Sequence, residues 1–83
     1  MKSEILKNIC YTELVYERIN KKLNIRLLKE QIEKLMFDAI QNTDEKYFER
    51  IGKNYYITNT KHNIRITVNS NTFRIITAYK LNK

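Results

Sequence analysis

The chain has 83 residues and a formal net charge of +7, which leaves room for one domain and excludes a second. A single cysteine, Cys10, excludes an internal disulfide and is typical of proteins of the reducing cytoplasm. We expect Cys10 to be a small buried residue. No apolar run approaches the ~18 residues that a membrane-spanning helix needs, so we expect a soluble, cytoplasmic protein with no membrane partner.

The positive charge is unevenly distributed along the chain. The sequence holds 11 Lys, 10 Asn and 12 Ile residues, a bias that AT-rich coding produces and that raises the net charge by itself. Residues 1–42 carry eight basic and six acidic side chains, whereas residues 43–83 carry eight basic and three acidic ones, the last of them Glu49. This asymmetry favours a polyanionic partner, with codon bias as the competing explanation.

The first half of the sequence has the spacing of helices. Ser3 is expected to cap a short first helix. Thr12 is expected to cap a second helix, in which Val15, Ile19 and Leu23 recur at four-residue steps and form one apolar face. A third helix is expected after a break near residue 24, because these apolar positions keep helical spacing over three turns: Leu28, Ile32, Leu35, Met36, Ala39 and Ile40.

From residue 47 the period changes to two. The segments NYYIT (54–58), IRITV (64–68) and TFRIITAYK (72–80) are rich in β-branched and aromatic residues and are separated by Asn- and Thr-rich turns. The segment KYFERI (46–51) fits either a short strand or a last helical turn. Sequential strands with short connections form an antiparallel meander. We therefore predict a single α+β domain over residues 1–83, helical in 1–42 and a β meander in 47–80, with two or three helices packed on one face of a three- to four-stranded sheet.

Alternation along the predicted strands assigns side chains to the two faces of the sheet. The face toward the helices is expected to carry Tyr55, Ile57, Ile64, Ile66, Val68, Phe73, Ile75 and Thr77. The opposite, outer face is expected to carry Asn54, Tyr56, Arg65, Thr67, Arg74, Ile76 and Ala78. Because Ile76 interrupts an otherwise polar face, we expect this face to be covered or to bind something; a register slip of one residue would invert the assignment.

The outer face of the sheet is the strongest candidate site. Basic side chains that neutralise phosphates, beside an aromatic ring that stacks a base, are what recognition of single-stranded RNA requires. The candidate nucleic-acid- or partner-binding residues are Lys53, Tyr56, Arg65, Arg74, Ile76 and Lys80. In the competing interpretation, Arg and Lys on an exposed sheet face only keep the protein soluble and protect strand edges.

A catalytic alternative is metal-independent cleavage of RNA, which needs a general base, a general acid and a cation for the phosphate. The weak candidates for these roles are Glu13, Arg18, Thr77 and Tyr79.

The single histidine, His62, falls in a predicted turn and is expected to be solvated. Cys10 and His62 have no partners at metal-ligand spacing, and one glycine cannot build a phosphate-binding loop. We therefore predict no metal and no cofactor, and we lean toward a protein that is not an enzyme.

Four segments resemble a small bacterial domain family of unknown function: TELVYERINKKL (12–23), GKNYYI (52–57), IRITVN (64–69) and FRIITAYK (73–80). The family pattern is similar to H-T-T-E-L-x-x-x-R-I-x-x-N-L, G-K-N-x-Y, I-T-I-N and I-I-T-A-H-K, in the same order. The polar positions that match it are Thr12, Glu13, Arg18, Gly52, Lys53, Asn54, Thr67, Asn69, Thr77 and Lys80. Cys10 and Tyr79 stand where the pattern has histidines. A more distant likeness to RelE- and colicin-like ribonuclease folds implies that any catalytic histidines of such relatives are lost here.

Two hypotheses follow from these observations. In the first, the protein is a small basic RNA-binding module on a ribonuclease-toxin-like scaffold, weakly active or inactive as a catalyst. In the second, it is a non-enzymatic inhibitor from a mobile element, similar to an anti-CRISPR protein, that binds a nucleic-acid-handling protein. Homodimerisation through the C-terminal strand or the outer sheet face stays open in both.

Overall fold

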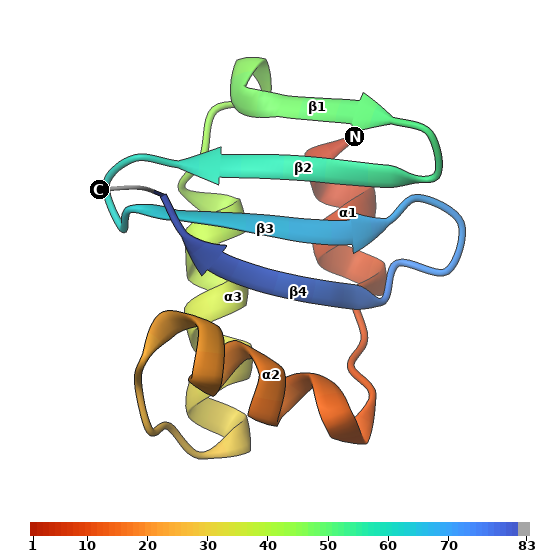
Figure 1. Ribbon diagram of the computed structural model, residues 1–83. Coiled ribbons are helices and arrows are strands. Elements are labelled where there is room, and N and C mark those ends of the chain that lie inside the picture. Colours follow the sequence, from red (N-terminus) through yellow and green to blue (C-terminus); the bar gives the residue numbers. More distant parts are fainter. Residues whose placement is uncertain (82–83) are drawn as a thin grey trace.

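The computed structural model describes residues 1–81 as three helices followed by a four-stranded antiparallel sheet (Figure 1). In chain order these are α1 (Lys2–Asn8), α2 (Glu13–Leu23), α3 (Lys29–Gln41), the single 3-10 turn η1 (Glu45–Tyr47), β1 (Phe48–Ile51), β2 (Asn54–Asn59), β3 (Ile64–Asn69) and β4 (Ile75–Lys80). The predicted α+β class is confirmed. The segment 46–51, for which a last helical turn and a short strand were both considered, contains both: its first two residues end η1, and the other four form β1.

The helix ends agree only in part with the predicted caps. Helix α1 begins at Lys2, one residue before the expected cap Ser3, which therefore lies inside the helix. Thr12 is the N-cap residue of α2, but its hydroxyl makes no capping hydrogen bond. Asn24 ends α2 in the left-handed conformation, with φ of 58°, which asparagine tolerates better than most residues.

The strands pair in sequence order, β1-β2-β3-β4, as a meander. Helices α1 and α3 lie behind one face of this sheet in the view of Figure 1, and the opposite face is turned toward the reader. Helix α2 lies below the sheet, beside its edge strand β4. The core between the layers is formed mainly by fully buried aliphatic side chains, the largest of which are Ile5, Ile19, Ile32, Met36, Ile40, Ile57, Ile66, Ile75 and Val68. Within residues 1–81 no helix is long and apolar enough to cross a membrane.

A β-bulge at Ile76 explains why two isoleucines are adjacent in a strand that otherwise alternates. Val68 pairs with Ile75, but the next residue of β3, Thr67, pairs with Thr77, so Ile76 is the extra residue. A bulge of this kind reverses the alternation that follows it. Thr77 consequently lies on the outer face, and Ala78, which pairs with Ile66, is fully buried on the helix side. The predicted faces of these two residues are therefore wrong.

Strand β4 is also shorter than predicted, because it begins at Ile75 instead of residue 72. Phe73 precedes it in the left-handed conformation, with φ of 61°, and so cannot continue an extended strand. This turn presents the Phe73 carbonyl to the backbone N–H of Cys10 at 3.0 Å, and the Ile75 N–H donates to the Cys10 carbonyl at 2.9 Å. Cys10 is exposed, contrary to the expectation of a buried thiol.

The two edges of the sheet differ. The edge at β4 is joined by the bridge from Cys10 to Arg74, and α2 packs beside the strand; a homodimer through this strand stays a prediction. The edge at β1 carries Glu49 opposite Tyr56 on the outer face and Arg50 opposite Tyr55 on the helix side. Both charged side chains are exposed.

Candidate nucleic-acid interface

A groove runs between α2 and the start of β4. Helix α2 lies alongside β4 at the lower border of the sheet in Figure 1, and both run in the same direction in that view. The face formed by Val15, Ile19 and Leu23 is buried, as predicted. We call the hollow beside it the α2–β4 groove; its lining residues are Thr12, Leu14, Val15, Arg18, Arg74, Ile75 and Ile76.

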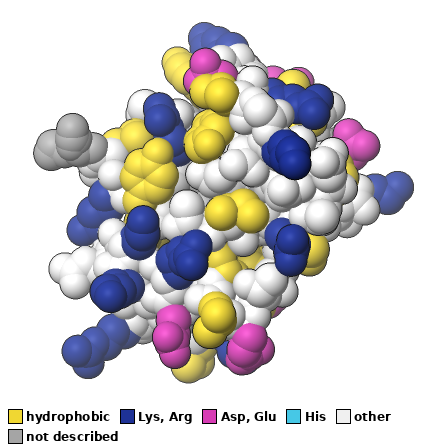
Figure 2. Space-filling view, turned by 45° about the vertical axis from the view of Figure 1, so that its right-hand side comes forward, with side chains coloured by type: hydrophobic (Ala, Val, Ile, Leu, Met, Phe, Trp, Pro, Cys, Tyr) yellow, Lys and Arg dark blue, Asp and Glu magenta, His cyan; other side chains and the backbone are white. Residues whose placement is uncertain are grey.

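Cations continue along the exposed side of α2. A second, shallower hollow is lined by Leu14, Glu17, Arg18, Lys21 and Lys22, and so shares Leu14 and Arg18 with the groove. We call Arg18, Lys21 and Lys22 the α2 ledge; all three are exposed. Figure 2 shows Lys and Arg side chains gathered over the lower left of the molecule, at the height of α2 in Figure 1, with acidic side chains at the lower edge.

The cations of the groove and ledge are not compensated by ion pairs. Among residues 1–81 the ion pairs are Lys29 with Glu13 and Lys34 with Asp38, both away from the groove lining. Glu17 is the one carboxylate that lines the hollow next to the ledge. Uncompensated cations on one surface create a positive potential that attracts a polyanion.

The side chains on the outer face of the sheet differ in part from those predicted. Arg65 pairs with Tyr79 across β3 and β4, and its Nε donates to Thr58 Oγ1 at 3.1 Å. Tyr56 pairs with Thr67, so two tyrosines and one arginine do share this face. Arg74 and Ile76 line the α2–β4 groove at the β4 border of the sheet, and their placement on the outer face stays a prediction.

The two predicted rim lysines lie at opposite ends of the sheet. Lys53 sits in the turn between β1 and β2, where its carbonyl accepts hydrogen bonds from the N–H and hydroxyl of Ser70. Lys80 ends β4 and lines a separate apolar hollow together with His62. Of the six predicted binding residues, the structure therefore brings Arg74 and Ile76 together with Arg18, and Arg65 near Tyr56, while Lys53 and Lys80 stand apart.

The four weak catalytic candidates do not converge on one point. Glu13 is bonded to Lys29, whereas Arg18 faces the groove. Tyr79 pairs with Arg65 on the outer face. The Thr77 hydroxyl oxygen is buried and has no hydrogen-bond partner. His62 is exposed in the turn between β2 and β3, as predicted. Within residues 1–81 no group of three His, Cys, Asp or Glu side chains could hold a metal ion.

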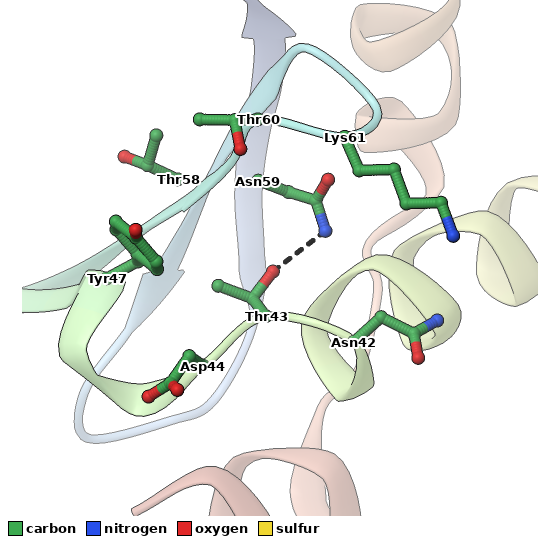
Figure 3. Close-up of a pocket in the computed structure, with 8 residues that line it drawn as sticks. All are labelled: Asn42, Thr43, Asp44, Tyr47, Thr58, Asn59, Thr60 and Lys61. Atoms are coloured by element: carbon green, nitrogen blue, oxygen red, sulfur yellow. Dashed lines mark hydrogen bonds between the residues drawn. The ribbon is translucent and has the colours of Figure 1, made fainter.

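A polar hollow at the end of α3 was missed by the sequence analysis. Figure 3 shows its lining, contributed by the segment after α3 and by the end of β2: Asn42, Thr43, Asp44, Tyr47, Thr58, Asn59, Thr60 and Lys61. Asn59 is 4% exposed, and its Nδ2 donates to Thr43 Oγ1 at 2.9 Å and to the Ala39 carbonyl at 3.0 Å. Its Oδ1 accepts from the His62 N–H at 2.7 Å. Every polar atom of this side chain is satisfied within the protein, so the hollow is a structural feature.

A tyrosine cluster joins the start of α2 to α3 and was also not predicted. The rings of Tyr11 and Tyr16 stack with their centroids 5.5 Å apart, and the Tyr16 hydroxyl donates to Glu33 Oε2 at 2.5 Å. Desolvation, the hydrogen bond to Glu33 and the negative charges of Glu33 and Glu13 raise the pKa of Tyr16 to about 12. Burial is also the main cause that raises the pKa of Tyr11. Both phenols therefore stay protonated at neutral pH and act as donors to α3.

The fold and the groove define a small basic α+β domain, with two helices behind one face of a four-stranded meander and a third helix beside its edge strand β4. The chain belongs to the family DUF3781, described as "Protein of unknown function", whose match covers residues 3–79. The resemblance to a small domain family of unknown function is thereby confirmed. No curated protein and no solved structure matches the chain, and the likeness to RelE- and colicin-like ribonucleases stays a prediction.

Proposed function

We propose that this protein binds single-stranded RNA, with phosphates along the α2 ledge and the α2–β4 groove and with bases over the outer sheet face. The observation that carries the proposal is a set of five cations on α2, on β3 and just before β4 that form no ion pair within residues 1–81: Arg18, Lys21, Lys22, Arg65 and Arg74. Tyr56 and Tyr79 on the neighbouring sheet face supply rings on which bases stack.

Single-stranded RNA fits this surface better than a duplex. Proteins that hold single strands combine a basic track with aromatic platforms, whereas duplex RNA is recognised through its shape and backbone alone. The proposal is limited to binding, because Glu13 is engaged by Lys29 while Arg18 faces the groove. The exposed and unpaired thiol of Cys10 supports a reducing compartment, so we propose the cytoplasm as its location.

The test is the salt dependence of binding to a fluorescein-labelled 12-nucleotide single-stranded RNA, followed by anisotropy at 50 and 200 mM KCl. Each neutralised phosphate contributes about −0.7 to the slope of log affinity against log salt, so five cations give about −3.5. The fourfold rise in salt should then weaken binding about 100-fold. The same samples, run on a denaturing gel, report any cleavage of the RNA.

Charge variants separate a local site from the effect of net charge. The site variant combines Arg18→Gln, Lys21→Gln and Lys22→Gln, and its slope should fall to about −1.4, a roughly sevenfold loss over the same salt range. The control variant combines Lys7→Gln, Lys46→Gln and Arg50→Gln, three exposed cations outside the interface. Equal weakening by both variants would refute a site on α2. If the wild type binds no RNA at 50 mM KCl, the proposal is wrong, and the charge reflects either codon bias or the docking of a protein partner.

A further inference from the structure

The α2–β4 groove has the size and lining of a site for one small ligand group. Its volume is about 280 Å³, close to the ~300 Å³ at which small-molecule sites begin. Its floor is apolar, formed by Val15, Ile75 and Ile76, and Thr12 adds a hydroxyl that caps no helix N–H. A hollow of this size accommodates one unit of a polymer and excludes a longer folded segment.

Two arginines stand on different walls of the groove. Arg18 comes from the middle of α2, and Arg74 comes from the chain just before β4. Both are exposed and neither forms an ion pair within the part of the chain that the structure describes. The Arg74 side chain donates from Nε to Thr72 Oγ1 at 3.4 Å. Guanidinium groups bind phosphate oxygens in pairs of parallel hydrogen bonds, so the two walls are suited to one phosphate between them.

Two apolar side chains of the groove have no role in the core. Leu14 is 73% exposed on α2, and Ile76 is the bulge residue that falls out of the alternation of β4. The bulge directs Ile76 to the groove, where it is half-buried beside Arg18. An apolar pair next to two uncompensated cations matches the chemistry of a nucleotide, which joins a flat apolar base to a phosphate.

We propose that the α2–β4 groove holds one nucleotide of the bound strand, its phosphate between Arg18 and Arg74 and its base against Leu14 and Ile76. This inference rests on the proposed function and assigns one nucleotide of the bound strand to the groove. The rest of the RNA lies over the α2 ledge and the sheet, where contacts are made to the backbone and to stacked bases.

The experiment is a titration of the ¹⁵N-labelled protein with uridine 5′-monophosphate, adenosine 5′-monophosphate, uridine and inorganic phosphate, followed by amide chemical shifts. Both nucleotides should shift the amides of Thr12, Arg74 and Ile76, and each should bind more tightly than uridine or phosphate alone. Arg74→Gln should weaken nucleotide binding about tenfold through the lost charge-assisted hydrogen bonds, and Ile76→Thr should weaken it severalfold. The same spectra show whether each variant is folded.

Matched controls and separate outcomes keep this inference apart from the proposed function. Arg50→Gln and Leu28→Thr change an exposed cation and an exposed leucine outside the groove and should leave the nucleotide shifts as in the wild type. If neither nucleotide shifts the groove amides while the 12-nucleotide RNA still binds, the inference is overturned and the proposed function stands. If nucleotides bind in the groove but RNA does not bind, the inference stands and RNA binding is refuted. If inorganic phosphate binds as tightly as the nucleotides, the groove is an anion site and the base contact is refuted.

Discussion

Asn59→Ala tests whether the buried amide at the end of β2 anchors α3. The Ala39 carbonyl lies in the last turn of α3, where carbonyls lack a partner within the helix, and it accepts hydrogen bonds from Asn59 Nδ2 and Thr43 Oγ1. The substitution removes three hydrogen bonds of Asn59, including those to Thr43 and His62. At roughly 1 kcal/mol for each, the free energy of unfolding should fall by about 3 kcal/mol. For a domain of this length the total is only about 4 to 12 kcal/mol.

The assay is urea unfolding followed by far-UV circular dichroism. Thr60→Ala is the matched control, because Thr60 lines the same hollow but is exposed, and it should stay within about 0.5 kcal/mol of the wild type. A double-mutant cycle of Asn59→Ala with Thr43→Val should show a coupling of at least about 0.5 kcal/mol, since the two side chains are in contact. If Asn59→Ala costs no more than the control, the network does not anchor α3.

Two further predictions concern the segment from α1 to the start of α2. A pKa of Tyr16 raised to about 12 in the folded state, above the ordinary value of ~10, contributes stability that is complete below pH 10 and is lost as the pH rises from 10 to 12. In Tyr16→Phe the free energy of unfolding should therefore fall less steeply between pH 10 and 12. The absorbance titration at 295 nm should also lose the phenol that ionises near pH 12. An unchanged titration would show that the Glu33 contact is not formed. Cys10→Ala should leave stability within about 0.5 kcal/mol, because the contacts of Cys10 to β4 are mainly backbone hydrogen bonds. Cys10→Pro loses the N–H that bonds to Phe73 and should cost at least about 1 kcal/mol by thermal unfolding; equal stability of the two variants would contradict the role of this bridge.

The architecture could be predicted from periodicity because helices and strands bury their apolar residues at different spacings. Val15, Ile19 and Leu23 are buried as expected, and so are Ile57, Ile64 and Ile66. The assignment failed after Ile76, because the bulge adds one residue to β4 and reverses the alternation of the residues that follow it. The doublet Ile75-Ile76 was the available signal, since two adjacent isoleucines break the alternation of a half-buried strand.

The candidate site was predicted less well than the fold. Arg74 was expected on the same sheet face as Arg65, and the sequence did not predict that Arg74, which follows the turn at Phe73, lines a groove together with Arg18. That proximity depends on how α2 packs against β4, a tertiary contact between segments far apart in the sequence. Asn59 was missed for a related reason: a buried polar side chain is recognised only when its partners, here Ala39 and Thr43, are known to lie beside it.

The open edge of β1 carries a charge arrangement that opposes self-association. When two copies pair antiparallel along this edge, side chains of opposed residues must lie on the same face of the joined sheet. If the two copies also keep their helices on the same side of the joined sheet, outer-face residues oppose outer-face residues. The two registers that satisfy this and still overlap most of the strand bring Glu49 against Glu49 or Arg50 against Arg50. Like charges directly opposite each other destabilise strand pairing, and charged side chains on edge strands prevent sheets from joining edge to edge. The same four residues that complete the sheet thus allow the free edge to stay exposed at high protein concentration without seeding aggregates.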